Sequence, residues 1–92
     1  MIIQFLTLRL HLPGCRSLKE KRRRISGFKD KLGKMSNIAI SESNYHDLHQ
    51  QAEWGVIIMA GDKQTVERIV AQVEAIIEQM DALLINMTRE YL

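Results

Sequence analysis

The chain has 92 residues, of which 46% are hydrophobic and 26% charged, a composition typical of one globular domain spanning residues 1–92. Its single cysteine, Cys15, excludes an internal disulfide framework and a cysteine-based zinc finger. The net charge of +2 is unevenly distributed: residues 1–34 contain ten Lys/Arg and two acids, whereas residues 35–92 contain three Lys/Arg and nine acids. This asymmetry predicts an anionic partner on one side of the molecule.

The first third of the chain reads as a strand followed by a helix. Alternating apolar residues predict a strand over residues 2–12, which Pro13-Gly14 ends. Ser17-Leu18-Lys19-Glu20 has the spacing of a capping box, so a helix is expected to begin after Ser17. Residues at helical spacing form its core-facing stripe, namely Leu18, Ile25, Phe28, Leu32 and Met35.

The rest of the chain is predicted to form two strands, a second helix and a last strand. Strands are predicted over residues 37–45 and 52–60, a helix capped by Asp62 follows, and a last strand covers residues 83–92. The order β-α-β-β-α-β with right-handed crossovers predicts an α+β fold, the ferredoxin-like plait. We expect a four-stranded antiparallel sheet of order 4-1-3-2 with both helices on one face. His11, the 14–17 loop and the 46–51 connection should then share one end of the domain.

A basic run at the start of the first helix is the strongest local signal. It is predicted to contact the phosphates of RNA, and it consists of Arg16, Lys19, Lys21, Arg22, Arg23 and Arg24. The alternative is an ordinary solvated face. Lys21 is unusual because it falls in the apolar stripe between Leu18 and Ile25. It must therefore extend its stem to the end of the domain or find a partner inside.

Two weaker patterns lie nearby. Gly14-Cys15-Arg16-Ser17 precedes a helix start, where an anion is favoured, and acylphosphatases hold phosphate at this place in a similar plait. Their fuller glycine-rich signature is missing here. His11, His46 and His49 are candidate partner contacts, and a metal site built from them is a weaker interpretation. We expect no bound metal and no cofactor.

The sheet face opposite the helices is predicted to be apolar. RNA-recognition motifs stack bases on such a face, but residues 52–60 lack their glycine-aromatic signature, although Phe5 and Trp54 are available. A face that carries Phe5, Ile57 and Met59 is instead expected to pack against a second copy, giving a homodimer.

Several segments resemble the YlxP-type family of small bacterial proteins, known as a domain of unknown function. The resemblance rests on His11-Leu12-Pro13, on Ser17-Leu18-Lys19-Glu20-Lys21-Arg22-Arg23, and on Asp47-Leu48 with Ala52-Glu53-Trp54-Gly55-Val56. It implies a ferredoxin-like fold. Because genes of this family often lie among those for translation factors and ribosome maturation, it also implies an RNA- or ribosome-associated role. His49 and Gln51 stand where the family commonly has Trp and Arg.

Three functions follow from these patterns. The first is a non-enzymatic RNA- or ribosome-associated factor that uses its basic helix. The second is a homo-oligomeric interaction module with an acidic protein partner, and the third is a small phosphohydrolase of acylphosphatase type centred on Arg16. We expect a cytoplasmic protein without a membrane partner, because no apolar run approaches the ~20 residues that span a bilayer and the apolar start lacks the basic lead of a signal peptide.

Overall fold

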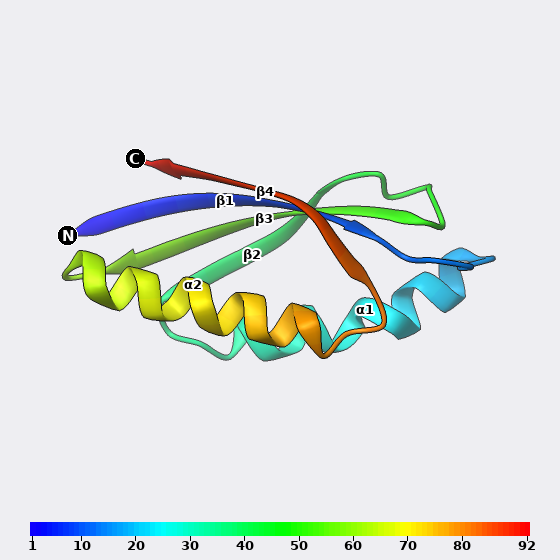
Figure 1. Ribbon diagram of the computed structural model, residues 1–92, viewed down its shortest axis with the longest axis horizontal. Helices are drawn as coiled ribbons and strands as arrows, with labels where there is room; N and C mark the ends of the chain where they lie inside the picture. The colour runs from blue at the N-terminus through cyan, green and yellow to red at the C-terminus, as the bar shows by residue number, and fades with distance from the viewer.

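Four strands and two helices make up the molecule. The computed structural model describes all of residues 1–92, in the order β1 (Ile2–His11), α1 (Leu18–Gly33), β2 (Ile38–Asn44), β3 (Gln51–Ala60), α2 (Lys63–Glu78) and β4 (Leu83–Tyr91). The strands form one antiparallel sheet of order β2-β3-β1-β4. Both helices lie against the same face of this sheet, and the two chain ends lie at the same end of it (Figure 1). The predicted ferredoxin-like plait and its strand order are confirmed.

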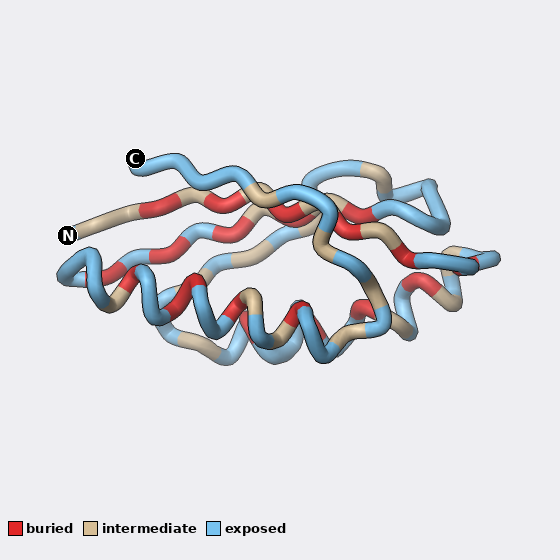
Figure 2. The backbone as a smooth tube through the Cα atoms, in the orientation of Figure 1, coloured by how far each residue is buried: buried red, intermediate tan, exposed pale blue.

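The two central strands separate a buried face from an open one. In β1, burial alternates strictly from Gln4 to Leu10, and β3 alternates in the same way over most of its length. Because successive side chains of a strand point to opposite faces, every second residue packs beneath the helices. Cross-strand neighbours such as Leu8 and Trp54 share the buried face. Figure 2 shows the buried positions repeating along both strands and along the inner sides of the helices.

Both helices begin at the capping residues that the sequence predicts. The Ser17 hydroxyl accepts a hydrogen bond from the Glu20 amide at 3.0 Å, and the Asp62 carboxylate accepts one from the Thr65 amide at 2.7 Å. The first helix ends at Gly33, so Met35, which was expected in its stripe, lies just beyond the helix and is half-buried. Neither helix is long and apolar enough to cross a membrane.

Trp54 lies on the buried face, contrary to the suggestion that its ring is available on the open one. Its register opposite Leu8 places the indole beneath α1, where it meets Phe28 edge to face with ring centroids 5.8 Å apart. The alternation around it agrees with this placement, since Ala52 and Val56 share the buried face while Glu53 and Gly55 lie on the open one. Of the two aromatic residues considered for base stacking, only Phe5 lies on the open face.

The contact between Phe28 and Trp54 yields a stability prediction. Replacing Phe28 by Ala leaves a cavity under the middle of α1, so we expect a loss of about 3–5 kcal/mol in the free energy of unfolding. Urea unfolding followed by Trp54 fluorescence measures it. The exposed Ser26→Ala on the same helix is the control, with a change within about 0.5 kcal/mol. A Phe28→Ala loss no larger than that of the control would contradict this packing.

Candidate nucleic-acid interface

The rotation of α1 divides the predicted basic residues into two groups. Ile25, Phe28 and Leu32 face the core, so residues on the opposite side of the helix face solvent. Lys21 is on the buried side, and Arg24 is half-buried at the edge of it. The other four side chains are exposed, namely Arg16, Lys19, Arg22 and Arg23.

Lys21 is a buried link between α1 and the end of β2. The residue is only 3% exposed. Its Nζ donates a hydrogen bond to the Tyr45 carbonyl at 2.8 Å and lies 3.2 Å from a Glu42 carboxylate oxygen. Of the two sequence-based alternatives for this lysine, the structure shows the internal partner. Burial therefore removes Lys21 from the predicted phosphate contacts, because its charge is already paired inside the protein.

The Lys21 contact fixes the start of the connection between β2 and β3. Tyr45 has a φ of 63°, in the left-handed region, where a non-glycine residue costs on the order of 1–3 kcal/mol. Its carbonyl also accepts a hydrogen bond from the Leu48 amide at 3.1 Å, and Arg9 lies over its ring at 5.5 Å. These contacts hold the strained residue in place.

Arg24 also serves the fold rather than a partner. Its side chain is only 10% exposed, and its Nε lies 3.1 Å from the Asp81 carboxylate. The same guanidinium donates to the Asp81 carbonyl at 3.0 Å and to the Pro13 carbonyl at 2.9 Å. It thus joins α1 to the segment before β4 and to the turn after β1. With its donors used internally, Arg24 also leaves the predicted set of phosphate contacts.

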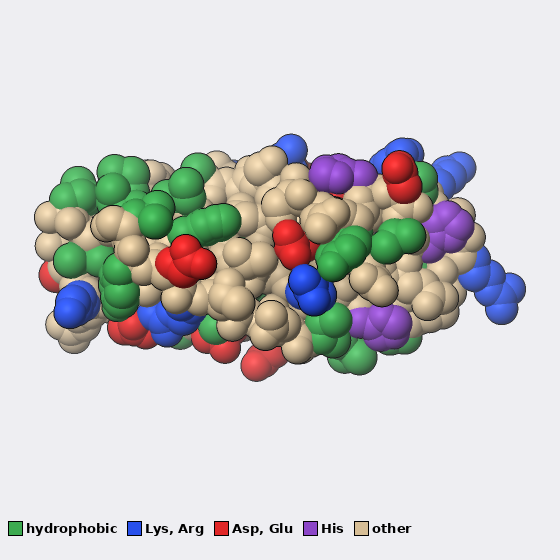
Figure 3. Space-filling view, turned by 90° about the horizontal axis from the view of Figure 1, so that it is seen from above, with side chains coloured by type: hydrophobic (Ala, Val, Ile, Leu, Met, Phe, Trp, Pro, Cys, Tyr) green, Lys and Arg blue, Asp and Glu red, His purple; other side chains and the backbone are tan.

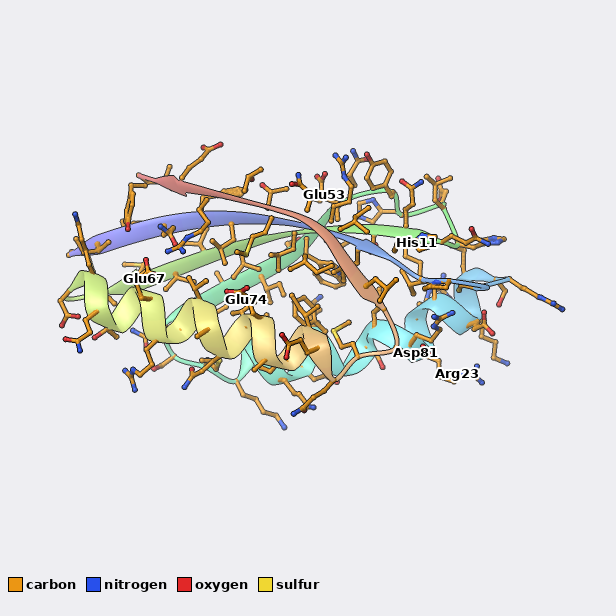
Figure 4. The ribbon with its side chains drawn as sticks, in the orientation of Figure 1. His11, Arg23, Glu53, Glu67, Glu74 and Asp81 are labelled. Atoms are coloured by element: carbon orange, nitrogen blue, oxygen red, sulfur yellow. The ribbon has the colours of Figure 1, made fainter.

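The remaining cations are exposed along the outer side and both flanks of α1 and next to its two ends, with the exposed Asp30 among them. Arg16, Lys19 and Arg22 have no ion-pair partner, and Arg23, 77% exposed, lies 3.8 Å from Glu20. Sequence reasoning did not single out the exposed lysines farther along, of which Lys29 lies on the flank of α1 towards β2 and Lys31 on the flank towards α2. We call the whole set the basic face, which consists of Arg16, Lys19, Arg22, Arg23, Lys29, Lys31 and Lys34. Figure 4 shows Arg23 on the outer side of α1 and Glu53 on the opposite side of the sheet.

The turn before α1 is occupied by the protein's own carboxylate. The Arg16 amide donates to Glu20 at 2.8 Å, and this hydrogen bond, followed by one from Cys15, lowers the pKa of Glu20. The Cys15 side chain is buried and also donates to the Ser17 carbonyl at 3.4 Å. A phosphate-binding loop needs free amides at this point. Here a carboxylate already accepts the Arg16 amide, which weighs against a phosphohydrolase centred on Arg16.

The three histidines come from the predicted end of the domain but do not converge. His11 Nδ1 lies 3.1 Å from the Gln50 carbonyl oxygen, which also accepts the Leu12 amide at 2.9 Å. These contacts confirm that the end of β1 and the 46–51 connection lie together. His46 lies instead 4.0 Å from Glu42, and His49 is exposed. No three His, Cys, Asp or Glu side chains are grouped so that they could hold a metal ion.

These features define a small ferredoxin-like α+β domain whose first helix presents exposed cations, most of them without an ion-pair partner. The chain belongs to the family described as "Protein of unknown function (DUF503)", whose model matches residues 3–89. No curated protein matches the chain.

The buried Lys21 gives a mutational test of this geometry. Lys21→Met keeps the apolar stem but removes the cation paired with Glu42 and one of the two donors to the Tyr45 carbonyl, which keeps the Leu48 amide. We therefore expect a loss of about 1–3 kcal/mol in unfolding free energy. Lys19→Met, on the exposed side, is the matched control and should change stability by less than about 0.5 kcal/mol. Urea unfolding measures both. Equal effects of the two substitutions would contradict the buried pair.

Glu20 predicts a specific dependence of stability on pH. Its pKa is lowered in the folded state from the ordinary value of 4.5, so its ionised form stabilises the fold above that pH, and this contribution is lost as the pH falls through the folded pKa. Glu20→Gln should therefore be less stable than wild type at neutral pH, and the gap should close in acid. Thermal unfolding across a pH series measures this. A gap that is constant over the series would show that the charge of Glu20 has no such role.

Proposed function

We propose that this protein is a non-enzymatic RNA-binding factor whose basic face contacts RNA phosphates. The observation that carries the proposal is the contrast within one run of cations. Lys21 and Arg24 are neutralised by Glu42 and Asp81, whereas Arg16, Lys19 and Arg22 are exposed and unpaired. Unpaired guanidinium and ammonium groups along one surface suit phosphate contacts, which need charge and reach more than fixed geometry.

The residues between these cations favour RNA over an acidic protein. The exposed positions of α1 carry no apolar or aromatic side chain, and Ser26, Gly27 and Gly33 lie among the charges. Hot spots of protein interfaces are enriched in Trp and Tyr as well as Arg, and this surface has arginines but no aromatic side chain. Small side chains instead let a sugar–phosphate backbone approach closely. The 16-residue helix offers this surface over about 24 Å.

The resemblance to the YlxP-type bacterial family supports ribosomal RNA as the target. Genes of that family often lie among those for translation factors and ribosome maturation, which fits a cytoplasmic, ribosome-associated protein. Two observations support a binding role without catalysis. Glu20 occupies the turn where an acylphosphatase-like loop would hold phosphate, and His11, His46 and His49 do not converge on one point.

Charge reversal on α1 tests the proposal. The double variant Arg22→Glu/Arg23→Glu should lose binding to ribosomal RNA fragments while keeping its far-ultraviolet circular dichroism, because Arg and Glu have similar helix propensities. The matched control is Lys63→Glu/Arg68→Glu on α2, which makes the same change in net charge at two exposed positions. The control should bind like wild type. Arg24 stays intact in both variants, since its substitution would also break the contacts with Asp81 and Pro13.

Filter binding across a salt series distinguishes phosphate contacts by α1 from a net-charge effect and from binding to an acidic protein. With about four phosphate contacts, each contributing about −0.9 to the log–log slope on duplex, a fourfold rise in salt should weaken wild-type binding about 150-fold. If both double variants lose RNA binding equally, the loss is an effect of net charge alone, and this result would contradict the assignment of the RNA contact to α1. Tight binding to polyglutamate instead of RNA would favour the acidic protein partner.

A further inference from the structure

The sheet face turned away from the helices has an uncovered apolar end. We call this surface the open face, and it consists of Ile3, Phe5, Thr7, Arg9 and His11 of β1 with Gln51, Glu53, Gly55, Ile57 and Met59 of β3. Ile57 and Met59 are exposed, although both are large and apolar. Figure 3 shows hydrophobic side chains gathered at the end of the molecule where the chain termini lie. Such a patch marks an interaction surface.

We propose that two copies of the chain pack open face to open face, about a twofold axis that runs along the strands between β1 and β3. This arrangement places β1 of each copy over β3 of the other, with the strands aligned as in sheet-on-sheet packing. It is independent of RNA binding, because the basic face lies on the opposite side of the sheet.

The strand register makes the open face complementary to itself about this axis. Each β1 residue lies over the residue of the other copy that it already faces within its own sheet. Phe5 is registered with Ile57, and Ile3 with Met59, so apolar side chains meet apolar side chains. Arg9 is registered with Glu53, so opposite charges meet across the interface. Thr7 is registered with Gly55. Because glycine has no side chain, the two copies can approach closely in this row.

The outer strands fit the same axis. It places β2 over β4 of the other copy, and the shared rows bring Ser41 over Thr88 and Ala39 over Glu90. A shallow hollow of about 280 Å³ around Phe5, Ala39, Ser41, Gly55 and Ile57 leaves room for these side chains. No row brings two like charges together.

The size of the whole sheet face is enough for an interface between two copies. Its strands have seven to ten residues, and with about 3.3 Å per residue and about 4.8 Å between strands the face covers about 570 Å² per copy. Two copies together bury about 1,100 Å², above the roughly 1,000 Å² expected of a biological interface. RNA is a poor occupant for this surface, since the only Lys or Arg among its residues, Arg9, is paired with Glu53 at 3.4 Å.

Sedimentation equilibrium at micromolar concentrations tests the proposal. Wild type should be a dimer, and Met59→Glu should be a monomer with unchanged circular dichroism, because it buries a charge only in the dimer. Leu48→Glu is the control, since Leu48 is 46% exposed against 43% for Met59 but lies outside the open face. It should remain dimeric. A monomeric wild type, or a Met59→Glu variant that still dimerises, would overturn the proposal and leave the face to a different protein.

A mixing experiment tests the twofold axis itself. Because Ile3 of one copy lies over Met59 of the other, Ile3→Lys and Met59→Glu should each be monomeric alone. In an equimolar mixture they should form a heterodimer, in which the new lysine meets the new glutamate. Absence of a heterodimer when each variant is folded and wild type is a dimer would refute this axis.

Discussion

The rotation of α1 about its own axis is set by what the helix buries. Phe28 packs edge to face on Trp54, and Lys21 enters the interior to pair with Glu42 and the Tyr45 carbonyl. Breaking such a buried pair by removing one partner leaves a charge without compensation, so the helix resists turning. With this rotation fixed, Arg24 reaches Asp81 and the arginines next to it in sequence face solvent. One buried contact thus selects which cations a partner can reach.

Much of the fold could be predicted because its signals are local. Alternation in β1, the turn at Pro13-Gly14 and the two helix caps each depend on neighbouring residues. The partners of the basic run are residues distant in sequence. Arg24 donates a hydrogen bond from its guanidinium to the carboxylate of Asp81, 57 residues away, at 3.2 Å. Lys21 was recognised as unusual, but its partner Glu42 lies on another strand. Trp54 lies on the buried face with Ala52 and Val56, and the alternation with Glu53 and Gly55 was sufficient to place it there. Local patterns therefore predicted the helices and strands. Which cations are exposed and unpaired could be determined only from the way these elements pack together.

The sheet separates two surfaces of different chemistry. On the helix side, the basic face carries charge without apolar anchors, which suits phosphates. On the other side, the open face is apolar at one end and pairs its Arg9 and Glu53 internally, which suits a second copy of itself. In the proposed dimer, the two α1 helices lie on opposite outer surfaces, so both basic faces stay accessible. Assembly and RNA binding can then occur together, without competition for the same residues.

Mapping the RNA contact onto the backbone tests the central claim most directly. In a low-salt titration of the isotope-labelled protein with a ribosomal RNA fragment, followed by amide chemical shifts, we expect the largest changes at Lys19, Arg22 and Arg23. Amides of the open face, such as those of Phe5 and Ile57, should change little. Shifts concentrated on the open face, with α1 unaffected, would contradict the claim that the outer side of this helix holds RNA.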